Sequence, residues 1–230
     1  MPVPKHARPT THRTSRSANR SRRGRGEGVV APDIVLHRSE KFSTRYGSFA
    51  EVHLIGVSEH ADLVRQHVLR LKYGKQKHIA RELAGIVHCA LLQLAIVPPD
   101  VVVTWAPTTD RRVQRRGFDQ AELIARHLGV LLGVRTLRLL RRTSEQTQTG
   151  HLRRERLRNP SFTSRGHARS HAVVVVDDVV TTGSTLRRAA EQLANDGYVL
   201  IICIAPSHQV SSQTFSGTTV SRSCLTGSTE

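Results

Sequence analysis

Two adjacent carboxylates, Asp177 and Asp178, stand between a short apolar run and a turn of small polar residues. The turn comprises Thr181, Thr182, Gly183, Ser184 and Thr185. It opens a helical stretch, and the free amides and positive dipole at the start of a helix attract a phosphate. Two carboxylates repel a purely anionic ligand, whereas they bind sugar hydroxyls or Mg²⁺. The pattern therefore predicts a sugar phosphate that lies across both groups.

The run before the carboxylates, Ala172–Val176, consists of five apolar residues, of which four are β-branched. This length and composition predict a central parallel strand that is buried on both faces. The helix after the turn ends near Gly197, a residue type common just beyond helix ends. Ligands of parallel sheets bind at the carboxyl ends of the strands, where these carboxylates stand. The plainer interpretation is a buried strand that happens to end in two acidic residues.

The segment from Val173 to Leu186, VVVVDDVVTTGSTL, resembles the phosphoribosyl pyrophosphate (PRPP) motif of type I phosphoribosyltransferases. The resemblance implies that Asp177 and Asp178 bind the ribose hydroxyls and that the turn wraps the 5-phosphate. It also implies Mg²⁺ as cofactor, held near the two aspartates through PRPP and without direct protein ligands. The chain has neither the Gly-Lys-Ser/Thr of a P-loop nor a GxGxxG that opens a helix.

Two further segments resemble the ComF family of phosphoribosyltransferase-like proteins, first noted in bacterial competence. LKYGKQKHIARELA makes Lys72 and Tyr73 candidates for substrate contact, and a basic corner between two helices is the alternative. RGFDQAEL matches the signature RGFNQAEL and adds the candidates Arg116, Gly117, Phe118 and Gln120. Asp119 stands where the family usually has Asn. The carboxylate still suits a helix cap, but it only accepts hydrogen bonds where an amide also donates.

The loop after the expected strand Val101–Trp105 lies on the same rim as the acidic pair, because carboxyl ends of parallel strands meet there. Arg111 and Arg112 in this loop are candidates for holding pyrophosphate, as the equivalent loop does in type I phosphoribosyltransferases. Solvated surface charge is the alternative. From residue 141 to 158 the chain is strongly polar, which predicts a mobile flap over the substrate. Its resemblance to the ComF pattern gives three candidates, Arg142, Gln148 and Arg156, and again a solvated loop is the alternative.

Strands are expected at Phe49–Val57, Val101–Trp105, Leu137–Leu140, Ala172–Val176 and Val199–Ala205, with helices between them. This alternation predicts an α/β fold with a mostly parallel central sheet flanked by helices, similar to type I phosphoribosyltransferases. We expect a phosphoribosyltransferase-like domain over residues 31–209. A disordered basic tail (1–30) and a disordered Ser/Thr-rich tail (210–230) are expected on either side of it.

The 230 residues carry a formal net charge of +17. Between Lys5 and Arg25 eight basic residues occur without an acidic one, so this tail is a candidate for weak nucleic-acid contact. No run approaches the roughly 18 apolar residues of a membrane span, and we expect a cytoplasmic protein without membrane contact. Cys89, Cys203 and Cys224 form no CxxC pair, which argues against a zinc site. A homodimer would agree with the enzymes that the chain resembles.

These features lead to the hypothesis of a phosphoribosyltransferase, a glycosyltransferase of nucleotide metabolism. It would bind PRPP with Mg²⁺, transfer the 5-phosphoribosyl group to a nitrogen acceptor and release pyrophosphate. Asp177 and Asp178 are its expected catalytic pair, and the sequence does not specify the acceptor. The alternative hypothesis is a non-catalytic protein that senses PRPP or associates with nucleic acid in DNA uptake or competence.

Overall fold

The computed structural model describes residues 32–58, 61–143, 161–164 and 170–207, all within one compact unit, Ala31–Glu230. Its larger sheet has five strands in the order β1-β2-β7-β6-β3. The bounds are β1 Asp33–Ser43, β2 Phe49–Ser58, β7 Leu200–Ala205, β6 Ala172–Val176 and β3 Val102–Trp105. Every neighbouring pair is parallel except β1 and β2, which are antiparallel. The expected mostly parallel α/β sheet is confirmed.

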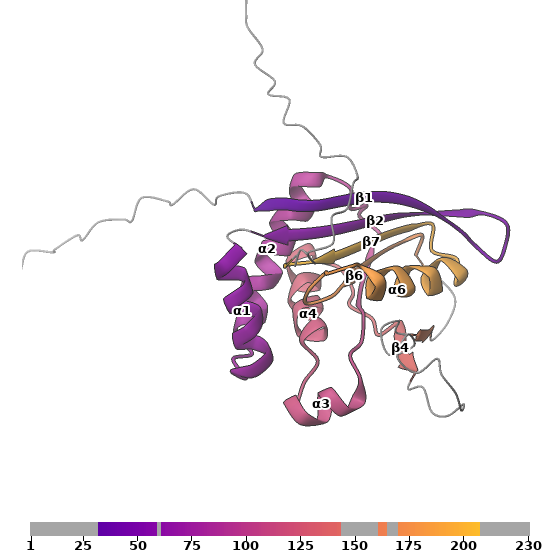
Figure 1. Ribbon diagram of the computed structural model, residues 1–230. Coiled ribbons are helices and arrows are strands. Elements are labelled where there is room, and N and C mark those ends of the chain that lie inside the picture. The colour runs from indigo at the N-terminus through magenta and orange to yellow at the C-terminus, as the bar shows by residue number, and fades with distance from the viewer. Residues whose placement is uncertain (1–31, 59–60, 144–160, 165–169, 208–230) are drawn as a thin grey trace, which may run out of the picture. The chain divides into compact units, whose positions relative to one another are not determined.

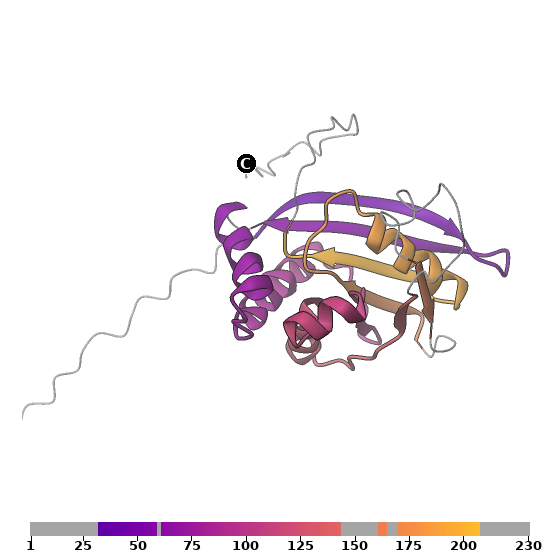
Figure 2. The ribbon, with the colours of Figure 1, turned by 60° about the horizontal axis from the view of Figure 1, so that its bottom comes forward.

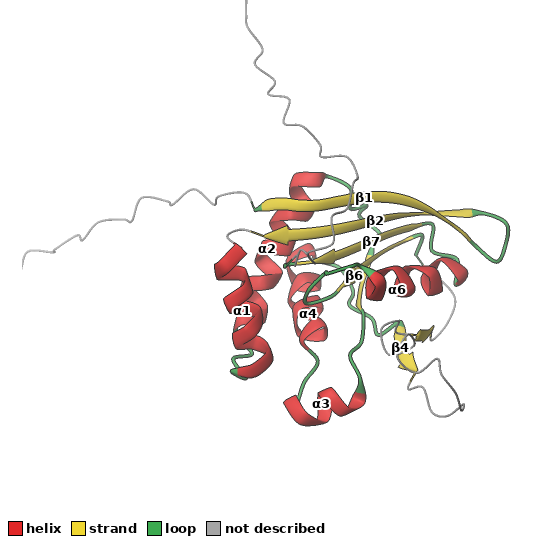
Figure 3. Cartoon of the chain, viewed as in Figure 1, coloured by secondary structure: helices red, strands yellow, loops and turns green. Residues whose placement is uncertain are grey.

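Helices cover both faces of this sheet. They are α1 (Ala61–Tyr73), α2 (Ile79–Leu94), α4 (Gln120–Leu132) and α6 (Ser184–Asn195), while the short α3 (Asp110–Arg116) buries no residue. Figures 1 and 3 show α1, α2 and α4 on one side of the sheet and α6 on the other. A small antiparallel sheet of β4 (Leu140–Thr143) and β5 (Ser161–Ser164) packs on the α6 side. None of the helices in the described part of the chain is long and apolar enough to cross a membrane.

The strand β6 lies inside the sheet, between β7 and β3, and all five of its residues are buried. Val174 and Val176 pack against the layer of α1, α2 and α4, while Val173 and Val175 pack against α6. Burying each such valine stabilises the fold by about 1.5–3 kcal/mol. The prediction of a strand buried on both faces is therefore confirmed. This burial holds the carboxyl end of β6 in place.

Three local expectations were wrong. The segment 33–43 forms β1, an edge strand that was not expected because polar residues interrupt its alternation. The residues after β3 were expected to form a loop as far as Arg112, yet they enter α3 at Asp110. This helix has no buried residue and is favoured by its charges, with Asp110 in its first turn and two arginines in its last. The fourth strand begins at Leu140 rather than at Leu137, where the chain makes only an isolated bridge through Thr136 to Val103.

The parallel arrangement brings the carboxyl ends of β3, β6 and β7 to one rim of the sheet. Backbone hydrogen bonds join the segments there, from Ala106 N to Val176 O at 2.9 Å and from Asp177 N to Ile204 O at 3.0 Å. Figure 2 shows the orange and yellow strands of this rim beside the long purple β1–β2 hairpin. The tails expected at 1–30 and 210–230 lie outside the described residues.

Candidate functional site

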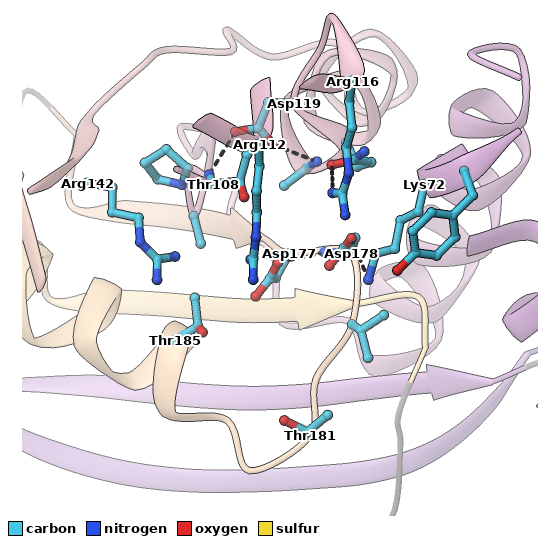
Figure 4. A pocket seen from close by; sticks show the side chains of 16 residues that line it. Lys72, Thr108, Arg112, Arg116, Asp119, Arg142, Asp177, Asp178, Thr181 and Thr185 are labelled. Carbon is cyan, nitrogen blue, oxygen red and sulfur yellow. Dashed lines mark hydrogen bonds and ion pairs between the residues drawn. The ribbon is translucent and has the colours of Figure 1, made fainter. Parts of the chain in front are cut away.

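A cavity of about 420 Å³ opens on this rim. Its lining comes from the end of α1, the loop after β3, the helices α3 and α4, the strand β4 and the loop after β6. The charged lining residues are Lys72, Arg112, Arg116, Asp119, Arg142, Asp177 and Asp178. Figure 4 shows the two adjacent aspartates in the middle, with Arg142 to the left, Lys72 to the right, and Arg112 and Arg116 above them. Segments far apart in the sequence thus converge on the acidic pair.

The acidic pair is partly buried and held by two contacts. The carboxylate of Asp177 accepts a hydrogen bond from the backbone N–H of Asp178 at 2.8 Å. The ammonium of Lys72 lies 2.8 Å from Oδ2 of Asp178. Burial, followed by the negative charge of Asp178, raises the pKa of Asp177 well above its usual range, and the Asp178 N–H and Lys72 only partly oppose this. The pair is therefore short of positive charge, and a cation or a hydroxyl donor would stabilise it.

The turn after the acidic pair forms a second, small hollow of about 20 Å³ at the start of α6. Thr181, Gly183, Ser184 and Thr185 line it, and Thr181 and Thr185 also face the main cavity. Gly183 adopts φ of 77° and lies directly over Leu54, so a Cβ atom there would come within 2.6 Å of the leucine side chain. Only glycine meets both demands. Thr182 lines neither hollow, and its hydroxyl accepts the Ser184 N–H at 3.4 Å, which shapes the turn.

Asp119 connects two of the segments that form the cavity. One carboxylate oxygen accepts the N–H of Ala121 at 3.1 Å and caps α4, which confirms the predicted cap. The other accepts the N–H of Thr108 at 2.9 Å and so ties the loop after β3 to the start of α4. The side chain is 7% exposed, and burial raises its pKa although these hydrogen bonds oppose the shift. The sequence indicated the cap but not the tie, because Thr108 lies in another segment.

The two candidates for holding pyrophosphate, Arg111 and Arg112, differ in their position relative to the cavity. Arg112 lines the cavity and Arg111 does not. The reason is the helix α3, in which successive residues point about 100° apart while residues four apart share a face. Arg112 and Arg116 thus face the cavity together. Arg142 also lines the cavity. It was expected in the flap, but it lies on β4.

The remaining candidates divide into three groups. Lys72, Tyr73, Arg116 and Gln120 line the cavity. Gly117 and Phe118 do not: Gly117 ends α3 with φ of 82°, and Phe118 is buried in the core beneath Lys77. The two flap candidates, Gln148 and Arg156, lie outside the described residues. The segment that joins α3 to α4 thus contributes its ends to the cavity and its middle to the core.

The cavity suits Mg²⁺ only together with a ligand. Asp177 and Asp178 supply carboxylate oxygens, the donor type that Mg²⁺ prefers, and Mg²⁺ commonly takes one or two carboxylates and completes its shell with substrate phosphates and water. Within the described ranges, no group of three or more His, Cys, Asp or Glu residues is placed to hold a metal ion by itself. The donor set therefore fits a cation that arrives with a phosphorylated substrate.

Comparison with known proteins defines the class. The family described as "Phosphoribosyl transferase domain" matches residues 113–221. A purine phosphoribosyltransferase from Pyrococcus horikoshii is 19% identical over 56% of this chain and 80% of its own, with a TM-score of 0.31. An adenine phosphoribosyl transferase from Trypanosoma brucei is 11% identical over 84% of this chain and 97% of its own, with a TM-score of 0.40. Residues 113–221 thus match the phosphoribosyl transferase domain family.

Curated relatives place it more closely. The DNA utilization protein YhgH of Salmonella typhi is 33% identical over 153 residues, 63% of this chain and 66% of that protein. Competence protein F of Haemophilus influenzae is 30% identical over 144 residues, 56% of this chain and 61% of that protein. The chain is thus similar, at about 30% identity, to a DNA utilization protein and to a competence protein. The alignments span just under two thirds of these relatives' own length.

Proposed function

We propose that the protein binds PRPP together with Mg²⁺ and transfers its 5-phosphoribosyl group to a nitrogen acceptor, releasing pyrophosphate. The observation that carries this proposal is the shared rim of the acidic pair and the hollow at the start of α6. Thr181 and Thr185 belong to both cavities, so one ligand can place a phosphate in the small hollow and its sugar against Asp177 and Asp178. A phosphorylated sugar satisfies both parts at once.

The 5-phosphate binds the turn after Val180. Its oxygens accept hydrogen bonds from the free backbone amides at the start of α6 and from the hydroxyls of the turn. The ribose hydroxyls donate to the carboxylates of Asp177 and Asp178, which fixes the position of the reacting carbon C1. Such positioning accounts for a large share of catalysis in reactions that need no covalent enzyme intermediate.

In the reaction itself, the bond from C1 to the pyrophosphate oxygen breaks and a bond from C1 to the acceptor nitrogen forms. The acceptor loses its N–H proton, and pyrophosphate leaves with the bonding electron pair. Arg112 and Arg142 line the cavity, and their guanidinium groups would neutralise this negative charge as it develops. Fixed positive charges at such a position stabilise the transition state. Asp177 and Asp178 would hold Mg²⁺ together with the substrate, and the ion would supply additional charge neutralisation.

Lys72 has a specific part in substrate binding. Its ammonium contacts Asp178, so in the substrate-free protein it takes the position of a cation beside the acidic pair. Binding of PRPP with Mg²⁺ must release it. Its long side chain then remains close enough to contact the incoming phosphates.

The test is pyrophosphate release from PRPP in the presence of Mg²⁺ and a panel of nucleobases, combined with calorimetric titration of PRPP. We expect release that requires Mg²⁺ and falls by about 100-fold or more in Asp178→Ala, because a group that positions the reacting sugar is lost. Asp100→Ala, which removes an acidic side chain at the other end of β3, should leave release unchanged. PRPP that neither binds nor reacts would overturn the proposal.

A second candidate function is a non-catalytic protein that senses PRPP or associates with nucleic acid. It is favoured by the printed names of the relatives, DNA utilization and competence proteins, and by the net charge of +17. Nucleic-acid binding through several phosphate contacts should weaken steeply between 50 and 200 mM salt, by roughly 10³-fold or more. PRPP binding without turnover, together with DNA binding of this salt dependence, would favour this function over the enzyme.

A further inference from the structure

The part of the cavity wall at the end of α3 and the start of α4 has an unusual polar composition. Gln120 is 1% exposed and lines the cavity. Its oxygen accepts a hydrogen bond from Nη1 of Arg116 at 2.9 Å, while its Nε2 has no partner among the described residues. A buried amide donor without a partner is unfavourable, so such a group is expected where a ligand will pair with it.

The orientation of this amide follows from chemistry. An arginine guanidinium donates hydrogen bonds and never accepts them, so the atom of Gln120 that faces Arg116 must be the oxygen. The NH₂ group therefore remains for the cavity. Nε of Arg116 is likewise buried without a partner in the described part of the chain. This wall consequently offers hydrogen-bond donors and no free acceptor from these two side chains.

An aromatic ring completes the same wall. The guanidinium of Arg116 lies over the ring of Tyr73, 5.8 Å from its centroid, and Tyr73 also lines the cavity. Tyr73 is 69% exposed, so a face of its ring is available for stacking by a planar ligand. Figure 4 shows Arg116 above the acidic pair, between Arg112 and Lys72, so a group bound at Arg116 would lie beside the ribose position of the proposed function.

We propose that Tyr73, Arg116 and Gln120 form the acceptor subsite, and that it selects a planar heterocycle which presents a ring carbonyl to the donors of Gln120 and Arg116. The inference rests on the proposed function and adds the substrate class to it. An oxo-bearing base such as hypoxanthine meets both donors with a carbonyl oxygen. Adenine places an amino group at the same ring position, so its N–H donors would face the N–H donors of Gln120 and Arg116. Sites that hydrogen-bond a particular substrate group discriminate strongly against analogues that lack it.

The matched probes are hypoxanthine and adenine, which differ at this ring position. With PRPP and Mg²⁺ present, we expect the wild-type protein to bind hypoxanthine at least about 10-fold more tightly than adenine in calorimetry. Pyrophosphate release should show the same preference. Gln120→Glu replaces the free donor by an acceptor, so the preference, measured at saturating PRPP, should fall to about 1 or reverse.

Two controls keep the outcome interpretable. Gln114→Glu makes the same change on the exposed surface of α3 and should leave the preference as in the wild type. Gln120→Met removes both polar atoms and should lower hypoxanthine binding without improving adenine binding, and its thermal midpoint reports whether it folds. Equal affinity for the two bases in a protein that binds PRPP would overturn the acceptor assignment and leave the proposed function standing. Absence of PRPP binding would overturn the proposed function itself.

Discussion

Two hollows of similar size lie at opposite ends of the strands β3 and β6. The cavity at the carboxyl ends has about 420 Å³, and a hollow of about 360 Å³ lies at the amino ends. The first is lined by seven charged side chains that come from five segments. The second has only two charged members among the described residues, Asp100 and Arg135. The rest of its lining is Pro99, Val101, Val102, Gly133, Val134 and Ser170. Size alone therefore does not distinguish a functional site in this fold.

The difference has a structural cause. At the carboxyl ends the chain leaves each strand through a loop and enters a helix, so free N–H groups and polar side chains point at the rim. At the amino ends no helix of the described chain begins, and the chain that leaves α4 at Gly133 passes through Val134 to the isolated bridge at Thr136. Backbone groups there are already paired, for example the Asp100 carbonyl, which accepts the Ser170 hydroxyl at 2.6 Å. The following predictions test how far this contrast extends.

The largest contrast concerns arginines in the two hollows. Arg112→Ala and Arg142→Ala should each lower kcat/KM for PRPP by about 10- to 100-fold, because positive charge beside the leaving pyrophosphate is lost. Arg135→Ala removes an arginine from the opposite hollow and should leave kcat/KM unchanged. Steady-state pyrophosphate release measures all three. An equal loss in Arg135→Ala would show that the effect comes from net charge and not from position.

A second contrast concerns two glycines with the same backbone conformation. Gly183 and Gly47 both have φ of 77°, but a Cβ atom meets Leu54 at Gly183 and nothing within 4 Å at Gly47. Gly47→Ala should cost about 1–2 kcal/mol of unfolding free energy from backbone strain alone. Gly183→Ala should cost about 1–3 kcal/mol more, because the turn must shift away from Leu54, and PRPP affinity should fall with it. Urea unfolding and calorimetry provide the two measurements, and identical unfolding costs would contradict the packing argument.

The third contrast concerns two side-chain hydrogen bonds to the backbone, made by Asp119 at the carboxyl ends of the strands and by Ser170 at the amino ends. Asp119→Ala leaves the N–H groups of Thr108 and Ala121 without their acceptor, which should cost about 1–2 kcal/mol. It should also lower PRPP turnover, since the loop after β3 is no longer held against α4. Ser170→Ala loses the contact to Asp100 and should cost about 1 kcal/mol without changing turnover. Turnover measured at a temperature where each variant is folded separates the two roles.

The smallest effect concerns pH and stability. Burial raises the pKa of Asp177 above its usual value of 3.8, so the folded protein holds more protons than the unfolded chain in the window above that value. Stability therefore falls as pH rises through this window. Asp177→Asn has no carboxyl group to ionise, so it should be more stable than the wild type at neutral pH. The difference in unfolding free energy between the two proteins should vanish below about pH 3.8. Urea midpoints of the wild type and Asp177→Asn from pH 3 to 8 check this. A gap that widens toward low pH would contradict the raised pKa.

Local sequence determined the part of the site that lies on one continuous segment. The β-branched run before Asp177 predicts β6 because such residues fit a strand buried on both faces. The hydroxyls and glycine of the turn predict the start of α6, and both were found where expected. These features depend on neighbours a few residues away, so their physical causes can be recognised without knowing the fold.

Only the tertiary structure decided which other residues join them. The phase of α3 turns Arg112 toward the cavity and Arg111 away from it, and no motif specifies that phase because α3 buries none of its residues. The contact of Lys72 with Asp178 joins residues about a hundred positions apart, and the tie from Asp119 to Thr108 depends on two loops meeting at one rim. The sequence by itself thus determined the chemistry of the acidic strand end and its turn. Chain packing determined their partners, because distances between remote segments follow from how the sheet and helices are assembled.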